Sequence, residues 1–505
     1  KILIIKYLIH HMRKLFFLIQ LIPACYLLNA QSIKVYSNPP ALASIKEADL
    51  KKDLYALADA HFKGRSGGTI DELKAAMWIG EKYREIGLKP AGDDGTFFQY
   101  FNIWRNRINQ QSSIRINNQS LAWWSEVAVA QMANCNINAP ILYVNKADVA
   151  SLSVENVKGK VIAIEADPTL YNPAVSLPTW RYARSVQTRY GNPLIAKGAL
   201  AIIFVADEVG EKTWEDAAAN FKRGAYEVEG GPAMNITTTA PVIWVRSSSK
   251  NVLQKGDATL NANIIIEQYD YPSVNIIGKI DGTDPTLSKE YLLYSGHTDA
   301  HGIRNPVNGD SIYYGADDNA SIDVAMFAMA RAFKKNPPKR SVLFVIHGAE
   351  ERGLLGSKWY AGHPTVPINN IVTVLNADMI GRNHPDSAAV LGTQSPHKNS
   401  SELVDLLYQA NQEGPQFKLD TLWDKPSHPE GWYFRSDHLP YARLGIPSLM
   451  FTTLLHPDYH TPLDNAERID YAKLKKMTDW MYRLGWKVAN SPKPPAKEVG
   501  FKLER

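Results

Sequence analysis

The 505-residue sequence has few cysteines, little net charge and no long apolar segment beyond its first residues. It contains two cysteines, Cys25 and Cys135, which excludes a fold built on several disulfides. The formal net charge is +5, and no basic run occurs outside the extreme N-terminus, so nucleic acid is not an expected partner. The hydrophobic fraction of 45% is ordinary for globular proteins. The length exceeds one domain of about 100 to 200 residues.

The first 30 residues have the features of a secretory signal peptide. Residues 12–14 are Met-Arg-Lys, and the apolar run at 15–28 is shorter than a transmembrane helix requires. Ala30 supplies a small residue for cleavage. We therefore expect an exported protein, periplasmic or extracellular, without a membrane span after cleavage. A membrane anchor or a lipoprotein signal ending at Cys25 are the alternatives, and the apolar run continues past Cys25, which disfavours the second.

The pattern of apolar residues divides the remaining chain. Residues 31–111 and 264–490 are expected to form one α/β domain, with 112–263 as an insert and 491–505 as an irregular tail. Helices are predicted at 46–63 and 70–86, the second with Leu73, Ala76, Met77, Ile79 and Tyr83 on one face and Gly87 as its C-cap. Strand-like runs dominate the insert, at 140–144, 161–164, 201–205 and 242–245.

The second half of the chain alternates between strands and helices. Apolar runs at 291–295, 341–346, 371–375 and 446–451 predict strands, and 321–335 predicts a helix. This alternation predicts a mixed, largely parallel central sheet flanked by helices on both faces.

Histidines and carboxylates recur in the loops after these strands. The candidates are His297, Asp318, Glu350, Glu351, Asp378 and His460. Side chains at the carboxyl ends of parallel strands meet in one cleft. Two imidazoles and three carboxylates suit two zinc ions that share one carboxylate, and one glutamate remains as a base. Four carboxylates in one cleft would repel each other without such cations. Asp299 is expected to be an outer partner of the His297 imidazole or its surroundings. The set predicts a hydrolase, in particular a peptidase.

These motifs resemble those of the co-catalytic dizinc aminopeptidases and their relatives, the glutamate carboxypeptidase and transferrin receptor group. The matching motifs are Gly296-His297-Thr298-Asp299, Gly315-Ala316-Asp317-Asp318-Asn319-Ala320-Ser321, Glu350-Glu351-Arg352-Gly353-Leu354-Leu355-Gly356-Ser357, Asn376-Ala377-Asp378-Met379-Ile380-Gly381, Ser436-Asp437-His438 and Tyr459-His460-Thr461-Pro462. The resemblance spans about 46–110 and 264–488. The segment between them resembles a protease-associated domain, which is β-rich with interleaved helices.

The resemblance implies a role for each residue. His297 and Asp378 would hold one zinc ion, Glu351 and His460 the other, and Asp318 would bridge them. Glu350 would be the general base, and Tyr459 would donate a hydrogen bond to the developing oxyanion. Ile322 stands where the family usually has glycine, which changes packing and removes no ligand. Asp437 and His438 match a motif near the cleft with a structural or substrate-positioning role, and no role is assigned to His301.

The expected activity is removal of N-terminal residues from peptides. Several alternatives remain open at this stage: a glutamate carboxypeptidase-like exopeptidase, a non-catalytic receptor-like protein, a glutaminyl cyclase and another dizinc hydrolase. The last carries a lid between its fourth and fifth ligands, for which the roughly 80 residues from Asp378 to His460 are too few. Arg352, Arg382 and Arg435 lie near the motifs and leave a carboxylate clamp possible. Monomer and homodimer are both compatible with the sequence.

Overall fold

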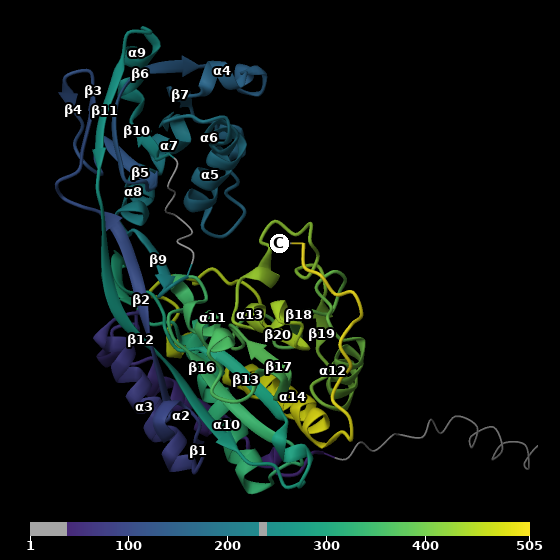
Figure 1. The fold of residues 1–505 in the computed structure, drawn as a ribbon. Coiled ribbons are helices and arrows are strands. Elements are labelled where there is room, and N and C mark those ends of the chain that lie inside the picture. Colours follow the sequence, from purple (N-terminus) through teal and green to yellow (C-terminus); the bar gives the residue numbers. More distant parts are fainter. Residues whose placement is uncertain (1–37, 232–239, 505) are drawn as a thin grey trace, which may run out of the picture. The chain divides into compact units, whose positions relative to one another are not determined.

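The computed structural model describes residues 38–231 and 240–504 (Figure 1). The signal peptide expected at 1–30 lies outside this described part. From Pro40 onward the chain forms one compact unit. None of the helices described is long and apolar enough to cross a membrane. Cys135 is a free, half-buried thiol at the start of β6 (Cys135–Val144).

The larger sheet has ten strands in the order β19-β18-β20-β17-β13-β16-β12-β2-β9, with β1 paired to β12. Their bounds are β1 (Lys89–Pro90), β2 (Phe98–Ile108), β9 (Ala225–Val228), β12 (Ile266–Ile280), β13 (Tyr291–His297), β16 (Ser341–His347), β17 (Ile371–Ala377), β18 (Ser387–Leu391), β19 (Lys418–Asp420) and β20 (Ser448–Thr452). The four central strands β16, β13, β17 and β20 are parallel, and antiparallel strands extend the sheet on both sides. The mixed α/β fold is therefore confirmed.

Helices cover both faces of this sheet. Alternate residues of β16 point to opposite sides, so Phe344 belongs to one core cluster and Leu343 to another. The first cluster is covered by α2 (Glu47–Leu57), α3 (Ile70–Ile86), α10 (Ser321–Lys335), α12 (Ser401–Glu413) and α14 (Tyr471–Asn490). The second contains Tyr360 of α11 (Leu355–Gly362) and Tyr441 of α13 (His438–Arg443).

Three local predictions need correction. The helix predicted at 46–63 ends at Leu57 and is followed by a separate short turn of helix at Ala60–Phe62. Met77 is 52% exposed, because the buried face of α3 runs through Ala76, Ile79 and Tyr83 and leaves Met77 at its edge. The strand predicted at 291–295 extends to His297, which is therefore the last residue of β13 and not part of the following loop. Gly87, with φ of 84°, is the C-cap of α3 as predicted.

A second sheet of eight strands is formed by the middle of the chain, in the order β4-β3-β11-β6-β7-β8-β10-β5. The strands not yet given are β3 (Ser113–Ile116), β4 (Gln119–Ser120), β5 (Val127–Gln131), β7 (Val161–Glu165), β8 (Ala201–Val205), β10 (Val242–Val245) and β11 (Thr259–Ile264). It has a core cluster on each face. The long strands β2 and β12 lead from the larger sheet to this one and back (Figure 1). One strand of the same stretch, β9, pairs with β2 in the larger sheet instead.

Candidate active site

Neighbouring parallel strands bring four of the predicted site residues to one edge of the larger sheet. β13 ends at His297, and β17 is followed directly by Asp378. β16 lies on the other side of β13 and is followed, after a short turn, by Glu350 and Glu351. His460 comes from the loop beyond β20. The carboxyl ends of parallel strands share one edge, which is why segments far apart in the sequence meet here.

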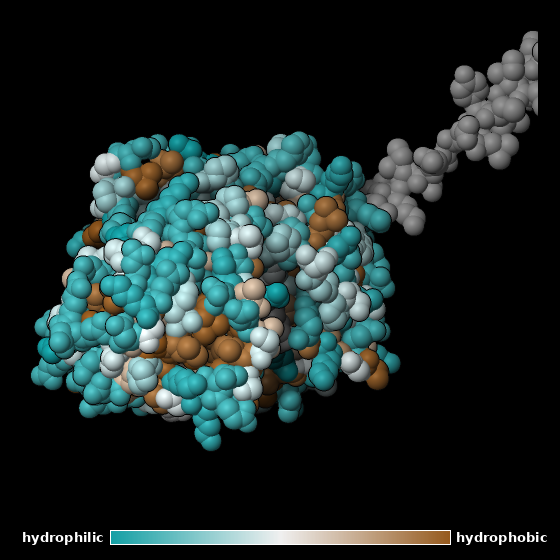
Figure 2. Space-filling model, turned by 90° about the horizontal axis from the view of Figure 1, so that it is seen from above, coloured by the Kyte–Doolittle hydropathy of each residue, from teal (hydrophilic) through white to brown (hydrophobic). Residues whose placement is uncertain are grey.

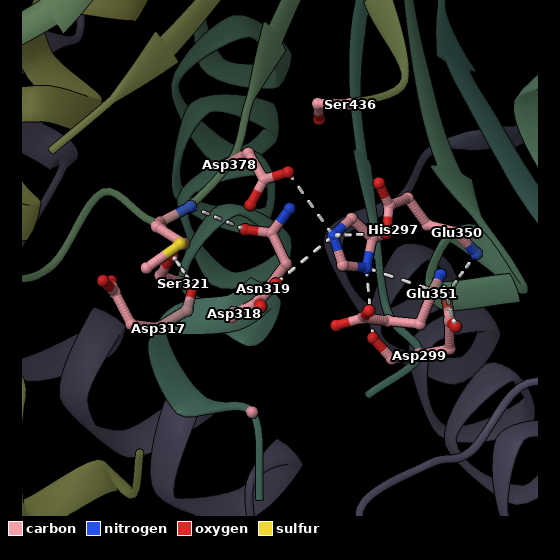
Figure 3. Close-up of polar contacts among 12 residues, drawn as sticks. His297, Asp299, Asp317, Asp318, Asn319, Ser321, Glu350, Glu351, Asp378 and Ser436 are labelled. Atoms are coloured by element: carbon pink, nitrogen blue, oxygen red, sulfur yellow. Dashed lines mark hydrogen bonds and ion pairs between the residues drawn. The ribbon is translucent and has the colours of Figure 1, made fainter. Parts of the chain in front are cut away.

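The imidazole of His297 lies among three carboxylates (Figure 3). Its Nε2 atom is 3.5 Å from Asp318 Oδ1, 3.6 Å from Asp378 Oδ2 and 3.7 Å from Glu350 Oε2. Its Nδ1 atom donates a hydrogen bond to the backbone oxygen of Asp299 at 3.1 Å, so the lone pair of the neutral ring is on Nε2. A cation between the Nε2 lone pair and the three carboxylates would stabilise this arrangement.

His460 forms a second group with two carboxylates. Its Nε2 atom is 3.1 Å from Asp318 Oδ2 and 3.1 Å from Glu351 Oε1. The two oxygens of Asp318 therefore face two different imidazoles, those of His297 and His460. The other carboxylate oxygen of Glu351 is 3.3 Å from Nε2 of His301. A carboxylate between two histidine-containing groups is the arrangement of a ligand shared by two metal ions.

The donor atoms fit zinc. The Nε2 atoms of His297 and His460 are buried and lack a hydrogen-bond partner among the described residues. Zinc bonds of about 2.0 to 2.2 Å in a tetrahedron place neighbouring ligand atoms about 3.3 to 3.6 Å apart. The nitrogen–oxygen distances of 3.5 and 3.6 Å around His297, and of 3.1 Å around His460, are close to that spacing. Imidazole nitrogen and carboxylate oxygen are also ligand types that zinc prefers.

The crowding of carboxylates has an electrostatic cost. Burial, followed by the charge of Glu351, raises the pKa of Asp318 to about 7. Burial also raises the pKa of Glu350 well above its usual range, and it raises the pKa of nearby Asp437 to about 7. His438, the residue after Asp437, is fully buried, and its ring lies against that of Tyr433 with 4.7 Å between the centroids. Divalent cations in the cleft would offset the repulsion between the carboxylates.

Asp299 holds the turn that carries the two glutamates. Its Oδ1 accepts a hydrogen bond from the backbone N–H of Glu350 at 2.8 Å, and its Oδ2 accepts one from the N–H of Glu351 at 3.2 Å. The contact with the imidazole of His297 is made by the Asp299 backbone oxygen, while Oδ1 lies 3.7 Å from Nδ1. The Asp299 carboxylate therefore orients the glutamate turn more directly than it orients the histidine.

Two further residues fix the loop of Asp318. The carboxylate of Asp464 accepts hydrogen bonds from the backbone N–H groups of Asp317 and Asp318, at 2.9 and 3.0 Å. Asn319 donates to the backbone oxygen of Ala377 at 3.1 Å, which ties this loop to the residue before Asp378. Both contacts place the Asp318 side chain between the two histidine groups.

Three residues at or next to the site have a strained backbone. Ala349, Met379 and His460 have φ values of 53°, 59° and 57°, in the left-handed region that residues other than glycine rarely adopt. Such conformations cost on the order of 1–3 kcal/mol each and persist where the surroundings impose them. One precedes Glu350, one follows Asp378, and the third is itself a site residue.

Ile322, which stands where the family usually has glycine, packs against Gly296. Ile322 is fully buried, and a Cβ atom on Gly296 would lie 2.3 Å from its Cγ2. The isoleucine thus occupies the space that the missing side chain at 296 leaves free. His297 follows this contact directly and keeps its position.

A cavity of about 290 Å³ adjoins the two histidine groups. Its charged lining includes Asp318, Glu350, Glu351 and Asp378, and its apolar lining includes Leu177, Trp180, Leu354, Met379, Trp432 and Phe434. Tyr459 also lines it and stacks on His460, with 3.6 Å between ring centroids. The hydroxyl of Tyr459 accepts a hydrogen bond from Nη2 of Arg435 at 2.9 Å, so its own O–H can donate elsewhere.

The middle of the chain reaches this cavity through α5 (Pro178–Val186) and the residues before it. Glu430 connects the two parts. Its carboxylate accepts hydrogen bonds from the backbone N–H and the hydroxyl of Ser176, at 2.7 and 2.6 Å, and from Arg181 and Arg435, both at 2.9 Å. Leu177 follows Ser176, and Trp180 lies in the first turn of α5; both remain partly exposed, at 40% and 43%. The surface in Figure 2 is largely polar, with apolar side chains exposed near its centre.

The sequence analysis assigned no role to His301 and missed three further polar residues at or around the site, Arg65, Arg304 and Asp464. His301 contacts Glu351, and Arg304 donates to Nδ1 of His301 at 2.6 Å. Asp464 binds the Asp318 loop as described. Arg65 is fully buried and donates to the backbone oxygens of Thr298 and three other residues. His301, four residues after His297, was a visible signal in the sequence; Arg65 and Asp464 gave none, since their contacts depend on the tertiary fold.

Comparisons with known proteins agree with this geometry. Residues 275–484 match the model of peptidase family M28. Aminopeptidase YwaD of Bacillus subtilis (strain 168) is 28% identical over 246 residues, which are 43% of this chain and 52% of that protein. The chain thus aligns with about half the length of this relative. All of the motif residues, from Gly296 to Pro462, fall inside the matched family segment.

Solved structures share the fold. An aminopeptidase from Aneurinibacillus sp. strain AM-1 superposes with a TM-score of 0.55 and 18% identity, covering 92% of this chain and 97% of its own. The zinc aminopeptidase BSAP from Bacillus subtilis gives a TM-score of 0.54 and 19% identity, covering 91% and 97%. These likenesses extend over both sheets. The resemblance inferred from the motifs is confirmed over residues 275–484, which match peptidase family M28.

Proposed function

We propose that this protein is an exported zinc aminopeptidase that uses two zinc ions to remove N-terminal residues from peptides. The observation that carries the proposal is the position of Asp318, whose two oxygens face the imidazoles of His297 and His460. The match of residues 275–484 to peptidase family M28 supports the peptidase activity. The apolar run at 15–28 supports export.

The proposed ligand sets are those implied by the motifs, and the distances are compatible with them. His297 and Asp378 would hold one ion, Glu351 and His460 the other, and Asp318 both. When bound, zinc ions polarise the scissile carbonyl and make water more acidic. Glu350 reaches the same group, with Oε2 at 3.7 Å from His297 Nε2, and has no ligand role left to fill. It would accept the proton of the attacking water and give it to the leaving amine.

Tyr459 would act on the developing oxyanion. Because Arg435 already donates to its oxygen, the hydroxyl proton is free to point into the cavity. We predict that Tyr459→Phe lowers kcat by about 10² and changes KM little, since the bond forms mainly in the transition state. Steady-state kinetics on leucine p-nitroanilide measures this, with Tyr408→Phe on the exposed side of α12 as a control. An unchanged kcat would assign Tyr459 a packing role.

A free amine is the group expected next to the carboxylates. Two arginines that could have formed a carboxylate clamp are already paired, Arg435 with Glu430 and Arg382 with Asp458, at 2.9 and 2.6 Å. The cavity combines these carboxylates with the apolar side chains described above. That combination suits an N-terminal residue with an apolar side chain and a charged amine.

Blocking one end of a peptide at a time tests the proposal. The zinc-loaded protein should hydrolyse Leu-Gly amide and leave N-acetyl-Leu-Gly intact, because acetylation removes the charged amine. Cleavage of the acetylated peptide with no cleavage of the amide would establish a carboxypeptidase instead. Failure to cleave either peptide, or leucine p-nitroanilide, with zinc bound would favour a non-catalytic binding protein.

The module formed by the second sheet is proposed to be a protease-associated insert that borders the cleft. Glu430→Gln should weaken its contacts with Ser176 and Arg181, since a neutral amide accepts weaker hydrogen bonds. We predict a rise in KM for tripeptides of about 2- to 10-fold with kcat largely kept. The control is Glu229→Gln, an exposed glutamate paired with Asn102. Loss of zinc in Glu430→Gln would contradict a role limited to substrate access.

A further inference from the structure

A second cavity adjoins the zinc ligands and is lined by arginines. Its volume is about 510 Å³, and it reaches His301, Glu351 and His460. Arg223 comes from the end of α8 (Trp214–Arg223), Arg304 from β14 (Gly302–Val307) and Arg352 from the turn after Glu350. These three arginines come from separate segments and face one space next to the site; a fourth arginine of the lining, Arg184, lies over the ring of Trp180.

These arginines have no anionic partner among the residues that the structure describes. None of the three forms an ion pair with a carboxylate in the described part of the chain, and Glu351 is the one acidic residue in the lining. Residues 1–37 and 232–239 contain no aspartate or glutamate, so they supply no missing side-chain carboxylate. Nε of Arg352 is buried without a hydrogen-bond partner among the described residues. Arg352 does donate to Ser66 Oγ at 2.6 Å, but that partner is neutral. A half-buried cation without an anionic partner loses solvation that no opposite charge replaces, which suggests a ligand of opposite charge.

The arginines also affect one another. Burial, followed by the charges of Arg223 and Arg352, lowers the pKa of Arg304 to about 9. Burial, followed by the charge of Arg352, lowers the pKa of Arg223. The three groups are therefore close enough to repel one another. An anion between them would relieve the repulsion.

The arginine cavity borders both the apolar cavity and the proposed zinc ligands. Arg304 bonds to Nδ1 of His301, whose Nε2 contacts Glu351, so one imidazole ring separates the guanidinium from a ligand carboxylate. Glu351 and His460 line both cavities. In a peptide whose N-terminal side chain lies in the apolar cavity, the residues after the scissile bond form the leaving portion. This portion would extend past Glu351 and His460 into the arginine cavity.

We propose that Arg223, Arg304 and Arg352 bind a carboxylate on the leaving portion of the substrate, close to the scissile bond. This inference rests on the proposed aminopeptidase function. Guanidinium groups bind carboxylates through paired, charge-assisted hydrogen bonds. The carboxylate is either the free C-terminus of a dipeptide or the side chain of an acidic residue that follows the cleaved bond. Both sources present the same group to the cluster.

Two matched pairs of substrates separate these sources. The first compares Leu-Gly with Leu-Gly amide, and the second compares Leu-Glu amide with Leu-Gln amide. We expect kcat/KM to be about 10-fold or more higher for the carboxylate member of at least one pair, mainly through KM. A preference in the first pair identifies the C-terminal carboxylate, and one in the second identifies the acidic side chain. Equal rates in both pairs would overturn the proposal.

Variants assign the preference to the cluster. Arg304→Gln and Arg352→Gln should each reduce the ratio between carboxylate and neutral substrates toward one, with zinc content measured in every preparation. Lys222→Gln is the matched control, since Lys222 is exposed beside Arg223 and does not line the cavity, and it should keep the ratio. If both arginine variants kept the parent's ratio of kcat/KM between carboxylate and neutral substrates, other residues would be responsible for the preference. Failure of the parent on leucine p-nitroanilide tests the proposed function separately, because that substrate has no carboxylate.

Discussion

Replacing Glu350 by glutamine is expected to lower kcat by a factor of about 10² to 10⁴ while zinc stays bound, which is the range for loss of a general base. The substitution preserves the size of the side chain and removes its ability to take a proton. The fold around it is held through the backbone, because the Glu350 N–H bonds to Asp299 at 2.8 Å. The turn should therefore keep its conformation.

Three measurements test this expectation together. Steady-state kinetics on leucine p-nitroanilide gives kcat, metal analysis gives zinc per chain, and thermal unfolding reports whether the fold is intact. Glu229→Gln, on the exposed surface, serves as a control for the same chemical change. A kcat within about threefold of the parent would remove Glu350 from the proton-transfer role, because that loss is far below what a general base contributes.

Much of the fold could be predicted because the local patterns are strong. α3 and α10 have the bounds that helical periodicity and the flanking residues predict. The parallel strands are fully buried runs, such as Ser341–His347, which periodicity recognises as strands covered on both faces. The proximity of several candidate residues could be predicted from these strands, since His297, Glu350, Glu351 and Asp378 stand at or just after their ends.

The parts that could not be predicted depend on contacts between distant segments. Asp464 binds the N–H groups of Asp317 and Asp318 across about 146 residues, and nothing local distinguishes it from a surface aspartate. Glu430 looks like an ordinary loop residue, and its partner Ser176 is 254 residues away. The arginine cluster likewise joins three segments that no periodic pattern connects.

The orientation of Asp299 shows a finer limit. Its spacing from His297 suggested an outer partner for the imidazole, and the hydrogen bond to that ring is made by the backbone oxygen. The carboxylate is directed to the turn of Glu350 and Glu351 instead. Sequence spacing predicts that two residues are near each other, whereas which atoms meet depends on backbone geometry that the tertiary fold sets.

Asp318→Ala is expected to remove or loosen both zinc ions, whereas Glu351→Ala or His460→Ala should chiefly empty one site. The reason is that each oxygen of Asp318 faces a different imidazole, at 3.5 and 3.1 Å. Glu351 and His460 contact each other at 3.1 Å and belong to one group. Metal analysis after extensive dialysis should give about two ions for the parent, fewer than one for Asp318→Ala and about one for the other two variants.

Stability should follow the metal content. A ligand that binds only the folded state at 100 times its Kd stabilises it by about 2.7 kcal/mol. A chelator should therefore lower the Tm of the parent and have little effect on Asp318→Ala, which has no tightly bound zinc to lose. Asp317→Asn is the matched control. In the parent, Asp317 Oδ1 accepts a hydrogen bond from the N–H of Gly381 at 2.6 Å, and the amide oxygen of asparagine can still accept it. This variant should keep both zinc ions and the response to the chelator. Two tightly held zinc ions in Asp318→Ala would exclude the bridging role and require a different shared ligand.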